Sequence, residues 1–246
     1  MADKKTINIL HLYPDLLNLY GDKGNIASLK MRLEKRNIDV NIKRVTQNED
    51  AFSLEDIDIV FFGGGSDKEQ ELVCSLLKDK SADLREYVEA GGVFLAFCGG
   101  FNMAGREFYA ENNKVEGLGI IDITTNPGEK RLIGNVVLKS ELFSQKIVGF
   151  ENHGGSIDIG SYSPLGKVLT GYGNDEKGES EGVVYKNFIG TNLHGPLLPK
   201  NPMLCDYILG CALNKKYDDF NGLEALDDEL ENLANEYIVK TFAESK

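Results

Sequence analysis

Short apolar runs alternate with stretches of helical periodicity through roughly the first hundred residues of the chain. The runs are rich in β-branched residues and predict strands over 7–12, 39–45 and 57–62. Apolar residues three and four positions apart predict helices over 26–36, 68–77 and 82–90. Strands separated by helices pair in parallel through right-handed crossovers, so the pattern predicts a doubly wound α/β sheet. Groups that carry chemistry are expected at the carboxyl ends of its strands.

The pattern changes after residue 117, where strand candidates follow one another closely. They are predicted over 132–138, 147–151, 182–185 and 188–191. Turn signals such as Asn126-Pro127-Gly128 join them, so we expect an antiparallel extension that completes the mostly parallel sheet. A further helix is predicted over 202–213.

The last part of the chain is acidic and carries apolar residues at helical spacing. These residues are Leu223, Leu226, Leu230, Leu233 and Tyr237. The spacing predicts an amphipathic helix with one apolar face, but periodicity does not tell whether the chain's own body or a partner covers that face. We therefore predict two units, a domain over 1–215 and an acidic helical extension over 216–246.

A nucleophile elbow is predicted where the apolar run 93–97 reaches Cys98 and two glycines open a helix. Glycines at such a turn let the backbone pack closely while the sulfur stays accessible. The positive end of the following helix is expected to lower the pKa of the thiol and so favour the thiolate. The competing interpretation is a small buried hydrophobic residue at a strand end.

Composition and charge narrow the function. The chain has 246 residues and a net charge of −12, so a nucleic-acid partner is not expected, because phosphate binding needs a concentrated basic surface. The four cysteines, Cys74, Cys98, Cys205 and Cys211, lack metal-ligand spacing, and we expect neither a metal site nor a disulfide scaffold. No run predicts a signal peptide or membrane insertion, so a cytoplasmic protein is expected.

A nucleophilic thiol needs a base and donors for the developing oxyanion. His11 lies in the first predicted strand, where a satisfied buried role is the default. His153 and His194 remain as candidate bases; we favour His194, which directly follows a predicted strand, and expect His153 in a ligand-facing loop between turn glycines. Backbone N–H groups of Gly64, Gly65 and Gly99 are candidate oxyanion donors, although the glycine run is also explained by a tight turn.

Four motifs occur together in one order: Phe-Gly-Gly-Gly at 62–65, Cys-Gly-Gly at 98–100, Phe-Glu-Asn-His at 150–153 and Gly-Thr-Asn-Leu-His-Gly at 190–195. In this combination the chain resembles the class I glutamine amidotransferases of the cobyric acid synthase type, whose flavodoxin-like α/β fold it is then expected to share. The stretches 16–25 and 195–201 further resemble the glutaminase subunits of lipid II isoglutaminyl synthases. The resemblance covers about 7–213 and leaves the acidic extension out.

The resemblance implies that Cys98 attacks the side-chain amide of L-glutamine with His194 as base, and that Gly64 or Gly65 and Gly99 bind the oxyanion. It implies that Arg131 holds the α-carboxylate, a role that a guanidinium suits because it can bind in two places; a solvated turn arginine is the alternative. Ammonia would pass to a Mur-ligase-like partner of the MurT type in a heterodimer. No cofactor is implied in this chain, since ATP and Mg²⁺ belong to that partner.

Two departures from the family pattern limit the comparison. Asn102 stands where relatives have Gln, which shortens that substrate contact by one methylene. Pro196 stands where many class I enzymes have the glutamate that orients the histidine. Either Asp22 takes the place of that glutamate as the third member of a triad, or the site uses a Cys-His dyad without a third member. A corrinoid amidotransferase subunit and a non-catalytic binding protein are the alternative functions.

Overall fold

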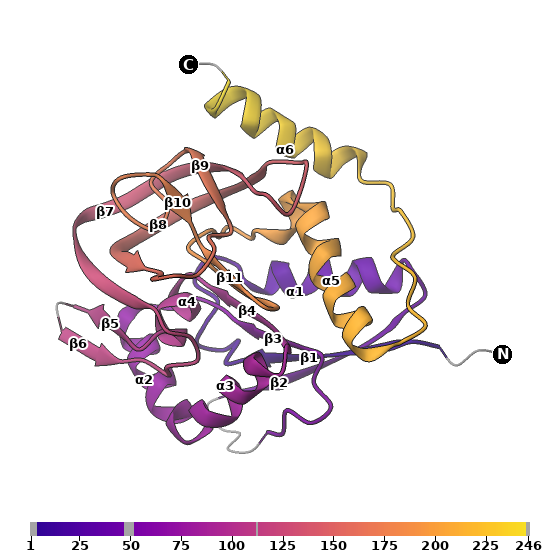
Figure 1. Ribbon diagram of the computed structural model, residues 1–246, viewed down its shortest axis with the longest axis horizontal. Helices are drawn as coiled ribbons and strands as arrows, with labels where there is room; N and C mark the ends of the chain where they lie inside the picture. The colour runs from indigo at the N-terminus through magenta and orange to yellow at the C-terminus, as the bar shows by residue number, and fades with distance from the viewer. Residues whose placement is uncertain (1–3, 47–51, 112, 245–246) are drawn as a thin grey trace.

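The computed structural model describes residues 4–46, 52–111 and 113–244 (Figure 1). Its main sheet has the strand order β11-β12-β4-β3-β1-β2 within those residues. The strands are β1 (Thr6–Leu12), β2 (Asp39–Val45), β3 (Ile59–Phe62), β4 (Val93–Phe97), β11 (Val183–Tyr185) and β12 (Phe188–Thr191). All neighbours pair in parallel except β11 and β12. The predicted doubly wound sheet is therefore confirmed.

Two layers of helices cover the main sheet. The helices are α1 (Lys23–Glu34), α2 (Asp67–Leu77), α3 (Ser81–Glu89), α4 (Gly99–Ala104) and α5 (Pro202–Lys216), with 3₁₀ turns η1 (Lys78–Lys80) and η2 (Leu198–Lys200). One apolar cluster joins α1 and α5 to one face of the sheet, and another joins α2, α3 and α4 to the other face. Every residue of β3 and β4 is buried, as expected for central strands covered on both sides.

Of the strands predicted after residue 117, those over 182–185 and 188–191 form the antiparallel pair β11 and β12, which extends the main sheet as expected. The strands predicted over 132–138 and 147–151 belong instead to a second sheet. It contains β5 (Glu107–Ala110), β6 (Asn113–Glu116), β7 (Thr124–Lys139), β8 (Ile147–Asp158), β9 (Gly166–Thr170) and β10 (Ser180–Glu181), in the order β10-β9-β7-β5-β6 with β8 paired to β7. The turn predicted at Asn126-Pro127-Gly128 is wrong. Pro127 lies inside β7, where the pairing with β8 shifts register between Pro127 and Leu132. A bulge accommodates a proline that cannot donate to the strand ladder.

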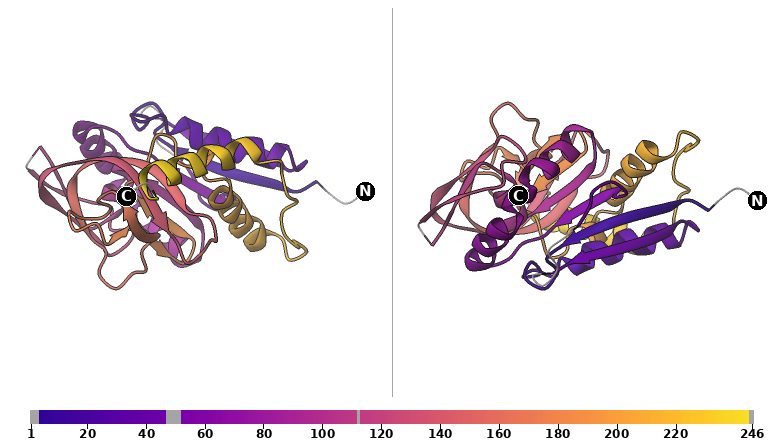
Figure 2. Two further views of the ribbon diagram at one scale, coloured as in Figure 1. Left: turned by 90° about the horizontal axis from the view of Figure 1, so that it is seen from above. Right: turned by 90° about the horizontal axis from the view of Figure 1, so that it is seen from below.

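The acidic extension returns to the body of the molecule as α6 (Glu229–Phe242), drawn in yellow across the second sheet in Figures 1 and 2. Val239 packs on Val137 of β7 and Val148 of β8. The expected helix is present for Leu230, Leu233 and Tyr237, and it contacts the chain's own body. Leu223 and Leu226 lie in the non-helical segment before it, so the prediction that they share this helix is wrong. The division at residue 215 stays a prediction.

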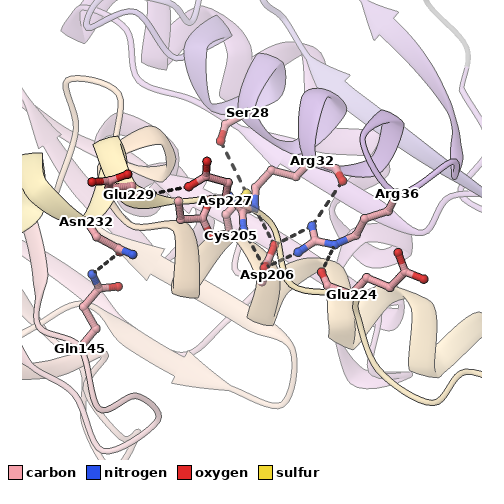
Figure 3. A network of polar contacts seen from close by, with 11 residues as sticks. Ser28, Arg32, Arg36, Gln145, Cys205, Asp206, Glu224, Asp227, Glu229 and Asn232 are labelled. Atoms are coloured by element: carbon pink, nitrogen blue, oxygen red, sulfur yellow. Dashed lines mark hydrogen bonds and ion pairs between the residues drawn. The ribbon is translucent and has the colours of Figure 1, made fainter.

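A polar network joins α1, α5 and the segment that leads to α6 (Figure 3). The Arg32 guanidinium donates to Asp206 through Nε and Nη2, at 2.6 and 2.7 Å, and to Asp228 through Nη1 and Nη2, at 2.6 and 2.8 Å. Arg36 shares Asp206 and donates from Nε to the carbonyl of Glu224. The Arg32 side chain is only 2% exposed, so this network anchors the start of α6 from inside the fold.

Replacing Arg32 by Met is expected to lower the free energy of unfolding by about 3 kcal/mol, because it leaves two partly buried carboxylates without their shared cation. Lys30→Met is the matched control on the same helix, since Lys30 pairs with Glu34 across exposed surface and is expected to cost no more than about 0.5 kcal/mol. Urea unfolding of both variants measures the difference. Equal stabilities would show that the network does not anchor the segment.

Candidate active site

Four neighbouring parallel strands end at one edge of the main sheet and bring the predicted site residues together. Thr191 of β12 pairs with Phe97 of β4, so Cys98 and the segment to His194 leave adjacent strands at the same level. Phe62 of β3 pairs with Ala96, which places the glycine run 63–65 on the other side of Cys98. Motifs far apart in the sequence therefore meet at the carboxyl edge.

Cys98 occupies the predicted sharp turn between β4 and α4. Its φ of 52° lies in the left-handed region, where a residue with a side chain is strained. A Cβ on Gly100 would lie 2.2 Å from the carbonyl oxygen of Phe62, so only glycine lets α4 approach β3 this closely. The Cys98 N–H donates to the carbonyl of Thr191 at 2.7 Å, which fixes the turn against β12.

The glycine run lies directly against the thiol. A Cβ on Gly64 would lie 3.3 Å from Cys98 Sγ. The Gly64 N–H, however, donates to Asp22 Oδ2 at 2.9 Å, so this amide is already engaged. Among the described residues, no hydrogen-bond partner is recorded for the Gly65 N–H. Of the two predicted donors in this run, Gly65 is the available one.

Asp22 bonds the backbone of the glycine run and not the histidine. Its other oxygen accepts from Asn25 Nδ2 at 3.4 Å, and burial raises the pKa of its carboxyl to about 6. Within the described residues no carboxylate accepts a hydrogen bond from the His194 ring. The arrangement therefore favours a Cys-His pair, with Asp22 holding the glycine run in place.

Burial controls the protonation of both central groups. Burial, joined by the charge of Asp22, raises the pKa of the Cys98 thiol to about 12, although the Gly99 N–H and Arg131 act in the opposite direction. The predicted lowering of this pKa is wrong, because the end of a six-residue helix does not offset the lost hydration of a thiolate. Burial lowers the pKa of His194 to about 4, so the imidazole is neutral near pH 7 and can accept a proton.

His194 lies between two aromatic rings. The ring of Tyr20 stacks on it with centroids 3.8 Å apart and planes 10° apart, and Phe150 contacts it edge-on at 5.7 Å. Backbone hydrogen bonds with Phe150 fix the His194 main chain. Its buried Nε2 has no hydrogen-bond partner among the described residues, so it makes no hydrogen bond to Cys98 Sγ. Catalytic hydrogen bonds often tighten only around the substrate, so this nitrogen is suited to the base role.

His153 lies in strand β8 and not in the predicted loop. Its Nδ1 is 3.0 Å from the Gly155 carbonyl oxygen, and its Nε2 is 3.4 Å from the carboxylate of Glu151. Glu151 accepts from the N–H groups of Tyr172 and Gly173 and is fully buried. His153 is thus held through Nδ1 at the wall of the site, whereas its buried Nε2, like that of His194, makes no hydrogen bond within the described residues.

A cavity of about 640 Å³ opens over the thiol and is lined by Cys98, Gly99, Arg131, His153 and Tyr20, among others. Arg131 extends from β7 and donates to Asn152, from Nε to Oδ1 at 3.0 Å and from Nη2 to the carbonyl oxygen at 3.1 Å. It therefore lies in a strand at the wall of the cavity and not in a turn, and its side chain is exposed to solvent.

Asn102 also lines this cavity. Its Oδ1 accepts from the Thr125 hydroxyl at 3.1 Å, and its Nδ2 lies 3.5 Å from Gln70 Oε1. Gln70 in turn donates to the carbonyl of Gly65 at 3.0 Å. The Asn102 side chain is thus linked to the glycine run 63–65 by hydrogen bonds through Gln70.

The sequence pattern assigns no role to two polar residues near the site, the half-buried Tyr20 and the buried Glu181. Tyr20 stands in the stretch 16–25 that carries the family resemblance, and that motif was the available signal. Glu181 accepts from Thr191 and Asn192, and burial raises the pKa of its carboxyl. Nothing in the local pattern around Glu181 distinguishes it from a surface acid. In the described residues no group of three or more His, Cys, Asp or Glu side chains could hold a metal ion.

The fold places a strained cysteine after one parallel strand and a histidine after the neighbouring strand, at the same edge of the sheet. This arrangement defines a class I glutamine amidotransferase. The model of the CobB/CobQ-like glutamine amidotransferase domain matches residues 8–202, and the chain belongs to that family. The described helices include none long and apolar enough to cross a membrane.

Two curated relatives match the chain along most of its length. The subunit GatD of the glutamine-hydrolysing lipid II isoglutaminyl synthase from Staphylococcus aureus is 41% identical over 95% of this chain and 95% of that protein. Its counterpart from Streptococcus pneumoniae is 40% identical over 94% and 90%. The crystal structure of a glutamine amidotransferase from Thermotoga maritima has the same fold, with a TM-score of 0.53, 17% identity and coverage of 94% of this chain and 93% of that one.

The raised pKa of Cys98 predicts how the thiol reacts with iodoacetamide. Because only the thiolate is nucleophilic, alkylation of Cys98 should accelerate about tenfold per pH unit from about pH 7 to pH 9 without a plateau. Asp22→Asn should speed the reaction at each pH, since it removes a charge that raises this pKa. Peptide mass spectrometry follows Cys98 alone. A plateau near neutral pH would show a thiolate that burial does not suppress.

Proposed function

We propose that this chain is the glutaminase subunit of a lipid II isoglutaminyl synthase. It hydrolyses L-glutamine to glutamate and ammonia and supplies the ammonia to a synthetase subunit, which amidates the α-carboxyl of D-glutamate in lipid II to D-isoglutamine. The observation that carries the proposal is the strained cysteine that lines a cavity at the end of β4, next to the strand that leads to His194. The relatives that match at 40–41% identity along nearly their whole length support the choice of substrate.

The reaction begins with transfer of the Cys98 proton to His194 as Sγ attacks the side-chain carbonyl carbon of glutamine. Both groups start neutral, and the attraction within the resulting ion pair offsets part of its cost in a buried site. The N–H groups of Gly65 and Gly99 stabilise the oxyanion. The C–N bond then breaks, and His194 returns its proton to the leaving nitrogen, which departs as ammonia.

A glutamyl thioester remains on Cys98 after ammonia has left. Water, losing a proton to His194, attacks the thioester carbon; the C–S bond breaks, glutamate leaves and the thiol regains the proton. Arg131 binds the α-carboxylate of the substrate, for which Asn152 orients its guanidinium. Asn102 and His153 line the same cavity and contribute to substrate binding.

The partner in this proposal is a Mur-ligase-like subunit of the MurT type, which forms a heterodimer with this chain in the cytoplasm. ATP and Mg²⁺ are used by that subunit, whereas the described part of this chain has no cluster of metal ligands. A corrinoid amidotransferase is the less supported alternative. It fits the family model, but the near full-length relatives are isoglutaminyl synthase subunits.

Substitutions of the cysteine and of the two histidines should have different kinetic effects. Cys98→Ala should abolish glutamine hydrolysis without unfolding the protein, because no thioester can form. His194→Ala should lower kcat by about 10²- to 10⁴-fold through loss of the base. His153→Ala should mainly raise KM. Steady-state kinetics with circular dichroism as a folding control test this. Wild-type turnover in Cys98→Ala, or exchanged effects of the two histidines, would contradict these roles.

The proposed partnership is tested by co-expression with the Mur-ligase-like subunit of the same organism. We expect a stable complex on size-exclusion chromatography and glutamine-dependent amidation of lipid II that requires ATP. Cys98→Ala in the same complex should lose amidation with glutamine but retain it with added ammonia, because the synthetase site is intact. A missing complex together with no ATP-dependent amidation would remove the cell-wall assignment and leave a stand-alone glutaminase.

A further inference from the structure

Helix α6 carries an exposed apolar stripe. Leu230, Leu233 and Tyr237 are 79%, 55% and 68% exposed, and among the other described large hydrophobic residues only Leu19, at 55%, is exposed to the same extent as Leu233. Their spacing of three and four residues puts them on one face of the helix. Apolar side chains that gather on one exposed helix face mark interaction sites more often than scattered ones do.

The chain's own body does not cover this stripe, because it holds the opposite face of α6. Asn235 is 1% exposed and donates from Nδ2 to the carbonyl oxygens of Lys146 and Lys200. Val239 is buried on the second sheet. Leu233 and Tyr237 are each two residues from Asn235, and two residues correspond to about 200° around a helix. The sequence pattern thus predicted an apolar face correctly, but the fold buries the other face.

The stripe is held in a defined position before any partner binds. Asn232 accepts from Gln145 at one end of α6, and the carbonyl of Phe242 accepts from Thr170 at the other (Figures 1 and 3). Asp228, immediately before the helix, bonds the buried Arg32. Little ordering of the helix is therefore required on association, which favours binding.

The charge around the stripe indicates which occupant it fits. Helix α6 carries three carboxylates (Glu229, Glu231 and Glu236) and one lysine, Lys240, which pairs with Glu236; Asp227 lies just before the helix. A second copy would bring like charges together, and this chain already carries a net charge of −12. A partner with basic residues around an apolar groove is complementary both to the apolar stripe and to the acidic residues beside it.

We propose that Leu230, Leu233 and Tyr237 of α6 form the docking surface for the synthetase subunit, which presents an apolar groove with a basic rim. This inference rests on the proposed function, since it takes the synthetase as the partner. An amphipathic helix that lays apolar anchors at this spacing into a hydrophobic groove is a recurring mode of recognition, and tyrosine is among the residue types that contribute most to binding energy. The acidic residues beside the stripe, Glu229 among them, set orientation and association rate.

The test is the affinity of the chain for the co-purified Mur-ligase-like subunit. The double variant Leu230→Asn/Leu233→Asn should weaken binding by about 100-fold, as expected for loss of two anchors. Its matched control is Leu72→Asn/Leu76→Asn, which changes two leucines of α2 that are 41% and 39% exposed and should leave binding unchanged. Glu229→Lys is a second variant and should weaken binding most at low salt. Thermal unfolding and glutaminase activity of each free chain should match the wild type.

The outcomes separate this inference from the proposed function. If the wild-type chain binds the synthetase and the double variant binds equally well, the stripe is not the docking surface, although the partnership stands. If the wild-type chain forms no complex, both the partnership and the inference fall. Self-association of the wild-type chain that the double variant abolishes would make a second copy the occupant and overturn the choice of partner.

Discussion

The left-handed backbone at Cys98 is the constraint on which the active site depends. A residue with a side chain at φ 52° costs about 1–3 kcal/mol and persists only when its surroundings fix it. Here the Thr191 carbonyl holds its N–H, and Gly100 lets α4 lie against the Phe62 carbonyl. The turn is thus fixed from both neighbouring strands. The turn exposes the Cys98 sulfur to the cavity, beside the glycine run that follows β3.

Burial fixes the positions of the reacting side chains and also makes their ionisation unfavourable. The packing that places Cys98 and His194 removes water from them, so the pKa of the thiol rises and that of the imidazole falls. Both groups are neutral near pH 7, and the ion pair that starts the reaction must be stabilised by the site. Gly99 and Arg131 favour the thiolate, whereas Asp22 opposes it while holding the Gly64 N–H. A glutaminase with this balance spends little time as a free thiolate.

Local pattern predicted the parallel half of the fold because each element there has a strong signal of its own. Asp39–Val45 was predicted with the bounds that the structure has, and the turn at Cys98 follows from its glycines. The second sheet was not predicted, because long-range pairing between β7 and β8 absorbs Pro127 in a bulge, where a local signal indicates a turn. Which sheet a strand joins depends on partners that are distant in the sequence.

The sequence predicts which residues form the candidate site, but it does not predict how the fold shifts their pKa values. Spacing and motif order indicated Cys98, His194 and Arg131, and the structure places Cys98 and Arg131 around one cavity, with His194 stacked against Tyr20, another residue of its lining. The sign of the thiol pKa shift could not be predicted, because it depends on burial and on Asp22, which is distant in the sequence. The engagement of the Gly64 N–H and the partner-free face of α6 likewise depend on tertiary contacts.

Covalent labelling with a chloroketone analogue of glutamine tests most directly whether Cys98 is the nucleophile of a glutamine-binding cavity. One adduct per chain is expected, at Cys98, with labelling slowed by glutamine and by the Arg131→Ala substitution. Peptide mass spectrometry locates the adduct and gives its stoichiometry. Labelling of Cys74, Cys205 or Cys211 instead, or labelling of Cys98 that glutamine does not slow, would contradict the assignment.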